Sequence, residues 1–306
     1  METISVVMIT YNHENYIEEA IQSILLQKVD CTIDFIISND NSSDNSHNII
    51  ENLIKNVPEN FVINYTYHSE NLGMMPNFIW ALQQARGKYI AICDGDDYWI
   101  DSLKLSKQLQ FLEENKDFSF CFHNAKNFIE KENRFVDIVD LDKHTHLSEA
   151  NNKILFKRLG GAFPTSSAFF KAEYLQPFPE YFKLFNVTDS PLILTGLLNG
   201  KIGYSSEKMS VYRTTLENWS AKNNLFENKW KNYQYKIETI ESFDELTNRK
   251  FNNQLKLSKD HLNYQIIYAY FKINPEKSKR FRFVRNNYQY LSLKNSLKII
   301  IRLLQK

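Results

Sequence analysis

Glycine is scarce in this chain of 306 residues, and none of its eight glycines precedes residue 73. The loops that cradle nucleotide phosphates in P-loop and dinucleotide-binding proteins need several glycines, because their backbone turns tightly and approaches the phosphates closely. The first expected strand-to-helix turn, TYNHENY at 10–16, contains none. If the chain binds a nucleotide, its phosphates must therefore be neutralised in another way.

Cysteine is also scarce, since the chain has only three, at positions 31, 93 and 121. They form no CxxC pair and are too few for a disulfide framework or a structural zinc site. No apolar run approaches the roughly 18 residues of a membrane-spanning helix, and the N-terminus lacks the basic region of a signal peptide. These absences predict a cytoplasmic protein without a membrane-spanning segment.

The formal net charge is only +1, but the charges are distributed unevenly along the chain. Residues 279–306 contain eight Lys or Arg and no Asp or Glu. The rest of the chain therefore carries a formal charge of about −7. An acidic body with a basic tail argues against a general nucleic-acid-binding protein, whose basic surface would extend over the folded domain.

The chain is long enough to bury a sizeable core, because 43% of its residues are hydrophobic. Up to residue 93, apolar runs typical of buried strands alternate with segments of helical periodicity. We expect strands at 4–10, 33–40, 61–68 and 89–93, and helices at 14–27, 44–56 and 76–85. This alternation predicts an α/β fold with a mostly parallel sheet flanked by helices. Another strand is expected at 118–125, and helices beyond about residue 225.

The densest group of acidic residues follows the apolar run at 89–93, in the segment CDGDDYWID. It contains Asp94, Asp96, Asp97 and Asp101. Like charges this close destabilise one another unless a cation lies among them, so the segment is either a solvated loop or a cation site. We favour a divalent metal held by Asp94 and Asp96, because ligands bind at the carboxyl edge of open α/β sheets. Such a metal would neutralise a diphosphate.

Six segments in order along the chain resemble family 2 glycosyltransferases, which have the GT-A fold. They are VVMITYNHENYIEEAIQSILLQ (6–27), IISNDNSSDNS (36–46), NLGMMPNFIWAL (71–82), GKYIAICDGDDYW (87–99), TDSPLIL (188–194) and GKIGYSSEKMSVYR (200–213). The resemblance covers roughly the first 220 residues. It implies a GT-A glycosyltransferase domain at 1–222, followed by a helical C-terminal region at 223–306.

The resemblance implies that the chain binds a nucleotide-sugar donor. The base and ribose would lie in a pocket lined by Thr10, Tyr11, Asn12 and Asp40. The donor diphosphate would be bound with Mn2+ or Mg2+ by the acidic cluster, through Asp94, Asp96 and Asp97. Many members have two aspartates where this chain has Asn39 and Asp40, so the base pocket here has one acid fewer.

Two more site residues follow from the resemblance. Asp189 falls where the family has its catalytic base, and Arg213 falls near the diphosphate, where its charge would stabilise the leaving phosphate. Each of these interpretations has an alternative, because Asp40 and Asp189 are also suited to cap a helix and Arg213 to form a structural ion pair. His13 is interpreted as a surface or packing residue.

These assignments predict an inverting glycosyltransferase that moves a sugar, from a UDP-sugar or related donor, to a hydroxyl of a glycan or lipid-linked acceptor in surface polysaccharide synthesis. Asp189 would accept the proton of the acceptor, and the metal would stabilise the departing diphosphate. A sugar nucleotidyltransferase is an alternative, although its glycine-rich opening loop is missing here. A non-catalytic module of the same fold that binds glycans or nucleotides is another.

The basic tail ends in LSLKNSLKIIIRLLQK, in which apolar residues recur at helical spacing beside Lys294, Lys298 and Arg302. The apolar residues are Leu293, Leu297, Ile300, Ile301 and Leu304. This pattern predicts a basic amphipathic helix. The helix would dock either on the acidic body of the protein or on the inner face of the membrane, where lipid-linked acceptors lie.

Overall fold

The fold is described from a computed structural model. The structure describes residues 3–138, 148–149, 155, 163–215, 226–274, 276–287 and 291–304. Residue contacts divide the chain into two compact units, one formed by Met1–Asn151 and Gly160–Thr215, the other by Asn152–Leu159 and Leu216–Lys306. The domain boundary expected after residue 222 lies outside the described residues.

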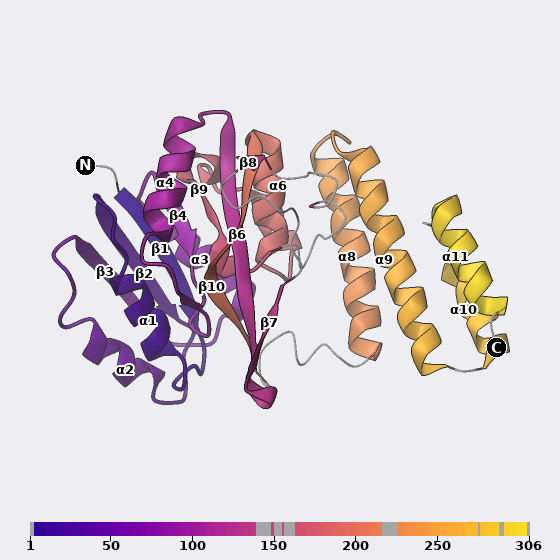
Figure 1. Cartoon of the computed structure of the whole chain (residues 1–306), viewed down its shortest axis with the longest axis horizontal. Helices are drawn as coiled ribbons and strands as arrows, with labels where there is room; N and C mark the ends of the chain where they lie inside the picture. The colour runs from indigo at the N-terminus through magenta and orange to yellow at the C-terminus, as the bar shows by residue number, and fades with distance from the viewer. Residues whose placement is uncertain are drawn as a thin grey trace. The chain divides into compact units, whose positions relative to one another are not determined.

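The first unit begins with alternating strands and helices, as the sequence predicted (Figure 1). The strands are β1 (Thr3–Thr10), β2 (Thr32–Asn39), β3 (Phe61–Tyr67) and β4 (Tyr89–Ile92), and the helices α1 (Ile17–Leu25), α2 (Ser46–Leu53) and α3 (Met74–Gln84). The strands pair in parallel in the order β3-β2-β1-β4. Val6, Val7 and Met8 are all fully buried, because both faces of β1 are covered, as is typical of a parallel sheet.

The sheet continues beyond β4 with strands of both directions in the order β3-β2-β1-β4-β9-β6-β10-β5, while β7 pairs with β6 and β8 with β10. The later strands are β5 (Tyr98–Trp99), β6 (Phe118–Ile129), β7 (Arg134–Asp137), β8 (Ser148–Glu149), β9 (Phe169–Lys171) and β10 (Lys201–Thr214). The helices are α4 (Lys104–Glu114), α6 (Asp189–Asn199) and the short η1 (Glu130–Glu132), η2 (Thr165–Ser167), η3 (Ala172–Leu175) and η4 (Glu180–Leu184). The longest pairings, including β6 with β10, are parallel, which confirms the predicted fold class.

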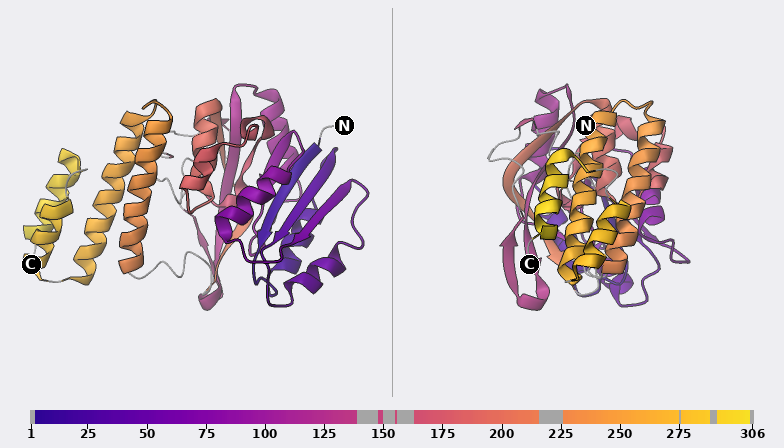
Figure 2. Two further views of the ribbon diagram at one scale, coloured as in Figure 1. Left: turned by 180° about the vertical axis from the view of Figure 1, so that it is seen from behind. Right: turned by 90° about the vertical axis from the view of Figure 1, so that its right-hand side faces the viewer.

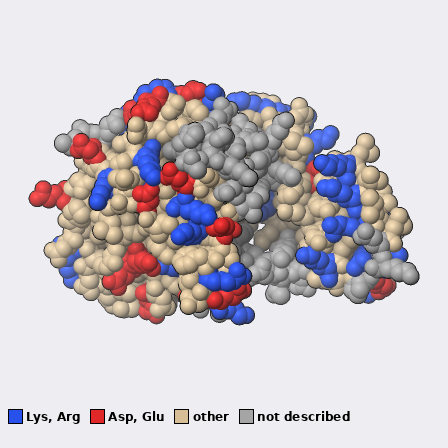
Figure 3. All heavy atoms as spheres, viewed as in Figure 1, with Lys and Arg blue, Asp and Glu red and all other residues tan. Residues whose placement is uncertain are grey.

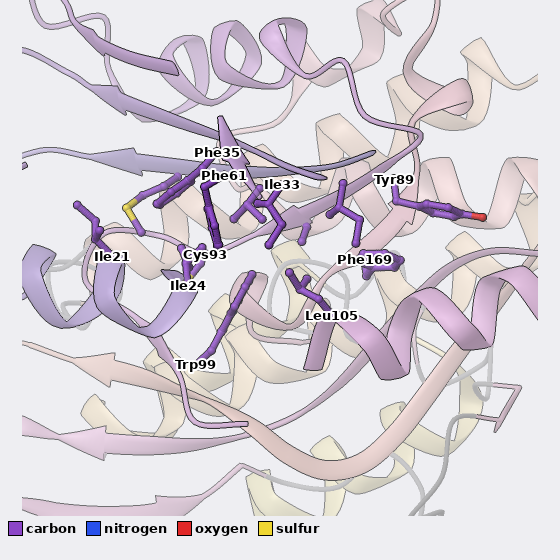
Figure 4. Close-up of a cluster of buried hydrophobic side chains, with 14 of the residues drawn as sticks. Ile21, Ile24, Ile33, Phe35, Phe61, Tyr89, Cys93, Trp99, Leu105 and Phe169 are labelled. Atoms are coloured by element: carbon purple, nitrogen blue, oxygen red, sulfur yellow. The ribbon is translucent and has the colours of Figure 1, made fainter. Parts of the chain in front are cut away.

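The core of the first unit packs helices α1 and α4 against the sheet (Figure 4). Ile17, Ala20, Ile21 and Ile24 recur at helical spacing and are all fully buried, so one face of α1 is apolar along its length. Leu105 of α4 and Trp99 of β5 belong to the same cluster of buried side chains. This packing fixes the positions of the first strands, whose carboxyl ends carry the candidate site residues.

The second unit is helical, as predicted beyond residue 225. Its helices are α8 (Phe226–Leu246), α9 (Asn252–Ile273), α10 (Lys277–Asn287) and α11 (Leu293–Leu304), which Figure 2 shows from two sides. Ile266, Ile267 and Phe271 of α9 form the core of this unit together with Ile299 of α11. In the described parts of the chain, no helix is both long enough and apolar enough to cross a membrane.

Candidate functional site

The acidic loop at residues 94–97 lies directly against the end of β1. The backbone N–H groups of Cys93 and Gly95 donate to the carbonyls of Val7 (3.1 Å) and Ile9 (3.0 Å). A Cβ atom on Gly95 would lie 2.7 Å from Oγ1 of Thr10 and 2.9 Å from Nδ1 of His13, closer than other residues allow. Glycine is therefore required here by a close approach, and it lets the two aspartates on either side lie beside residues 10–13.

Three buried polar atoms at this junction have no hydrogen-bond partner within the described structure: Oγ1 of Thr10, Nδ1 of His13 and Oδ1 of Asp94. The first two border Gly95, and the third belongs to the residue before it. Nε2 of His13 also lies 4.0 Å from Oδ2 of Asp96. Buried polar atoms are almost always hydrogen-bonded in folded proteins, so a water molecule or a ligand is expected to complete this group.

The electrostatics of the acidic loop favour a cation. Burial raises the pKa of Asp94 to about 7, and the charge of Asp96 adds to the effect. Among the residues that the structure describes, no three His, Cys, Asp or Glu side chains are grouped to hold a metal ion by themselves. Mg2+ is commonly bound by one or two carboxylates, with substrate phosphates as further ligands. Asp94 and Asp96 fit that arrangement, because the partnerless Oδ1 of Asp94 is a suitable oxygen ligand.

Asp97 is held by protein groups. It is almost fully buried, its Oδ1 accepts the backbone N–H of Arg213 at 3.0 Å, and the Ser166 side chain also hydrogen-bonds its carboxylate. Burial and the neighbouring charges of Asp96 and Asp94 raise the pKa of Asp97 well above its usual range. Asp97 thus anchors the acidic loop to β10, and its predicted contact with a donor stays a prediction.

Arg213, near the end of β10, reaches over the acidic loop. Its Nη1 donates to the backbone carbonyl of Asp96 at 2.7 Å, and its Nη2 forms an ion pair with Glu19. The guanidinium also lies over the Tyr98 ring, 4.4 Å from the ring centroid. The structure therefore contains the ion pair considered as an alternative, and it also places the positive charge of Arg213 beside the acidic loop.

The residues predicted to line the base pocket lie at the end of β1 and on the loops after β1 and β2, which hydrogen-bond to each other. The backbone N–H of Asp40 donates to the carbonyl of Thr10 (2.9 Å), and that of Asn12 donates to Oγ of Ser42 (2.9 Å). Asn12 has a left-handed backbone with a φ of 55°, which asparagine tolerates well. Tyr11 is 47% exposed, so its ring is accessible at the sheet edge. The structure thus brings Thr10, Tyr11, Asn12 and Asp40 together.

The carboxylate of Asp40 fixes the loop before α3. Its Oδ1 accepts the backbone N–H of Leu72 at 2.7 Å, and its Oδ2 accepts that of Gly73 at 3.0 Å. Gly73 is the N-cap residue of α3 and has a φ of 87°, which only glycine adopts readily. The alternative that Asp40 caps the next helix, α2, does not hold, because the N-cap residue of α2 is Asn45.

Asp189 is the first residue of α6 and is nearly buried. The N-cap residue is Thr188, so the alternative in which Asp189 is the cap does not hold. Oγ1 of Thr188 lies 3.1 Å from Oγ1 of Thr165 in η2, next to the Ser166 that hydrogen-bonds Asp97. The short helix η2 therefore connects the start of α6 to the acidic loop.

Two further residues lie at or near the acidic loop. His13, interpreted from the sequence as a surface or packing residue, packs its ring beside Gly95 and approaches Asp96. Asp101 was grouped with the acidic cluster. Its carboxylate instead accepts a hydrogen bond from the backbone N–H of Leu103 and forms an ion pair with Lys107. Asp101 thus supports the start of α4.

Comparisons with known proteins show the family and the fold of the chain. The family model described as Glycosyl transferase family 2 matches residues 5–175, more than half of the chain. The UDP-Glc:alpha-D-GlcNAc-diphosphoundecaprenol beta-1,3-glucosyltransferase WfaP of Escherichia coli is 35% identical over 132 residues, which are 43% of this chain and 49% of that protein. The chain spans between 19% and 54% of the length of the curated relatives it matches.

Two solved structures share the fold over most of the chain. TarS 1–349 of S. aureus in complex with UDP has a TM-score of 0.63 and 17% identity, over 92% of this chain and 78% of that one. The mannosyltransferase PcManGT of Pyrobaculum calidifontis, in complex with GDP-Man and Mn2+, has a TM-score of 0.60 and 14% identity, over 97% of this chain and 78% of that one. The fold is that of the GT-A glycosyltransferases. The chain belongs to glycosyl transferase family 2.

Proposed function

We propose that the chain transfers a sugar from a nucleotide-diphosphate donor to a hydroxyl of a glycan or lipid-linked acceptor, with inversion at the anomeric carbon, and that residues 1–222 form the catalytic domain. The observation that carries this proposal is the junction around Gly95, where three buried polar atoms lack partners beside Asp96. Family membership supports the class of reaction. The UDP complex of TarS and the UDP-Glc donor in the name of WfaP support a UDP-sugar, whereas the GDP-Man complex of PcManGT makes a GDP-sugar the second candidate.

The donor would lie along the carboxyl edge of β1, β2 and β4. Its base and ribose would contact Thr10, Tyr11 and Asn12, where the exposed Tyr11 ring offers a surface for stacking. Asp40 would support this pocket, because its carboxylate already holds the loop before α3. The hydrogen bonds between the loops at 10–14 and 40–46 would keep these two loops in place before the donor binds.

The diphosphate would lie at the acidic loop. Asp94 and Asp96 would hold Mn2+ or Mg2+, which supplies positive charge to a departing diphosphate when bound. Arg213 would add a fixed positive charge there, because Tyr98, Glu19 and the Asp96 carbonyl all orient its guanidinium. Asp97 would contact the donor diphosphate at its edge and would also hold the loop in position through its hydrogen bonds to Arg213 and Ser166.

Asp189 would be the general base. An alcohol is a poor nucleophile, so a carboxylate that accepts its proton during attack lowers the barrier. The Ser190 hydroxyl donates to Oδ1 of Asp189 at 3.3 Å, and the contact between Thr188 and Thr165 connects the start of α6 to η2. Both interactions would orient the carboxylate.

The acceptor would be a lipid-linked glycan in surface polysaccharide synthesis, for which the diphosphoundecaprenol acceptor in the name of WfaP is the support. An enzyme acting on such an acceptor must meet it at a membrane. We therefore include a peripheral association with the cytoplasmic face of a membrane in the proposal.

A panel of nucleotide-sugars tests the proposal. The melting temperature should rise with one UDP-sugar or with GDP-mannose in the presence of Mn2+, since a ligand at 100 times its Kd stabilises by about 2.7 kcal/mol. The same donor should be hydrolysed slowly, and EDTA should stop the hydrolysis. A donor that binds without hydrolysis would indicate the non-catalytic module instead, and a panel without any binding would refute a donor site.

A further inference from the structure

Helix α11 has two distinct apolar faces. Ile299 is only 1% exposed and packs with Ile266 and Ile267 of α9, and Leu303 is partly buried in the same core. Five other apolar residues of α11 are between 49% and 92% exposed: Leu293, Leu297, Ile300, Ile301 and Leu304. At about 100° per residue, this exposed stripe is centred roughly 130° around the helix from Ile299 and Leu303. Packing on α9 therefore accounts for one face and leaves the exposed stripe uncovered.

Basic side chains border the exposed stripe. Lys294 follows directly beside the stripe, Lys298 and Arg302 lie further around the helix, and Arg282 and Arg285 are exposed on the neighbouring α10. Figure 3 shows Lys and Arg gathered on the C-terminal helices, and α10 and α11 contain no Asp or Glu. Lys298 and Arg302 also lie over Tyr264 and Tyr268, at 5.5 Å and 4.1 Å from the ring centroids.

Two acidic groups lie near these helices. Asp260 of α9 accepts hydrogen bonds from the Ser292 backbone N–H and from Nδ2 of Asn295 (2.6 and 2.8 Å). Glu276 forms an ion pair with Lys279 at 2.8 Å. Arg282, Arg285 and Lys294 are exposed, and the basic residues of α10 and α11 outnumber these two acidic groups.

This combination fits an anionic lipid surface better than it fits a second copy of the chain. Two copies meeting through the exposed stripe would bring two sets of like charges together, which is unfavourable. A phospholipid surface would receive the apolar side chains among the acyl chains and the Lys and Arg side chains at the phosphates. With 12 residues, α11 is about 18 Å long, which suits a helix lying in the surface and is too short to cross the bilayer.

We propose that α11 lies flat in the surface of an anionic phospholipid membrane, with the exposed stripe inserted and the basic residues of α10 and α11 at the headgroups. This inference deepens the proposed function, because a lipid-linked acceptor would be presented at the same surface. It assigns the two tasks of α11 to different residues: Ile299 and Leu303 hold the helix on α9, and the exposed stripe binds lipid.

Co-sedimentation of the full chain with vesicles tests this proposal. We expect binding to phosphatidylcholine vesicles that contain phosphatidylglycerol, weak binding to phosphatidylcholine alone, and release at high salt. Lys294→Gln should weaken vesicle binding about fivefold, because each basic residue near an anionic membrane surface strengthens binding by about that factor. A double variant, Leu297→Glu with Ile301→Glu (the α11 pair), should weaken vesicle binding by at least about tenfold, since both substitutions place a negative charge in the exposed stripe.

The matched control is the pair Leu246→Glu and Leu257→Glu, which adds the same charge at exposed leucines of α8 and α9 and should bind almost like wild type. Circular dichroism of each variant establishes that the helices are intact. Equal losses in both pairs, unchanged binding of the α11 pair, or no binding of the wild type at low salt would overturn the proposal. So would a wild-type dimer, seen by sedimentation velocity, that dissociates in the α11 pair without any vesicle binding.

Donor hydrolysis by the same variants separates this proposal from the proposed function. The α11 pair should hydrolyse the donor at the wild-type rate, because the exposed stripe is not part of the candidate site. A wild type that binds vesicles but hydrolyses no donor would refute the glycosyltransferase proposal and leave the lipid surface supported.

Discussion

The backbone N–H of Arg213 donates a 3.0 Å hydrogen bond to Oδ1 of Asp97, across 116 positions of sequence. Nη1 of the same arginine donates to the carbonyl of Asp96. The acidic loop after β4 is therefore held at two points by β10, a strand formed more than 100 residues later. The geometry of the candidate diphosphate site depends on this contact as much as on the sequence of the loop itself.

Asp97→Asn and Asp97→Ala should show whether the hydrogen bond of Asp97 or its negative charge stabilises the acidic loop. Asparagine keeps Oδ1 as an acceptor for Arg213, so the free energy of unfolding should change by less than about 1 kcal/mol. Alanine leaves a buried N–H without an acceptor, which should cost about 1–3 kcal/mol. Urea denaturation of both variants measures this. Equal destabilisation would mean that the negative charge, and not the hydrogen bond, holds the loop.

Asp96→Ala should reduce Mn2+-dependent binding of UDP by at least about tenfold, because it removes one of the two carboxylates that fit the cation. Fluorescence or calorimetric titration with and without Mn2+ measures the loss. Asp101→Ala is the matched control, since Asp101 belongs to the same segment but supports α4. If Asp101→Ala lost as much binding as Asp96→Ala, the assignment of the cation to Asp94 and Asp96 would be wrong.

Lys104 should make stability depend on pH. It is fully buried with its Nζ 4.0 Å from the centroid of the Trp99 ring, and burial lowers its pKa to about 7. The unfolded chain, with a lysine pKa near 10.4, binds this proton more tightly than the folded protein. The Lys104 contribution therefore destabilises the fold at and below pH 7 and is relieved as pH rises from about 7 to 10.

Lys104→Met should consequently raise the free energy of unfolding at pH 7 by about 1–4 kcal/mol, because it replaces a buried charged side chain with an uncharged one of similar volume. The advantage of the variant over wild type should shrink by pH 10. Denaturation of both proteins at several pH values measures this difference. An advantage that stays constant with pH would show that packing, and not the charge, is responsible.

The sequence predicted every strand and helix up to residue 93, because buried parallel strands and amphipathic helices have strong local patterns. It could not show that Asp40 binds the backbone N–H groups of Leu72 and Gly73, or that Asp101 stabilises the start of α4. Both contacts depend on the positions of backbone groups in the folded chain. Nor could it separate the two faces of α11. Periodicity showed an apolar stripe, but only packing showed that Ile299 turns inward while Leu297 and Ile301 stay exposed.

The most direct test of the account is the rate of UDP-sugar hydrolysis by Asp189→Asn, measured as released UDP with Mn2+ present. Asparagine keeps the size of the side chain but cannot accept a proton, so the rate should fall by about 100-fold or more while donor affinity stays within about twofold. Such a result would support Asp189 as the general base of the transfer reaction. A rate close to that of wild type, with the donor bound equally well, would contradict it.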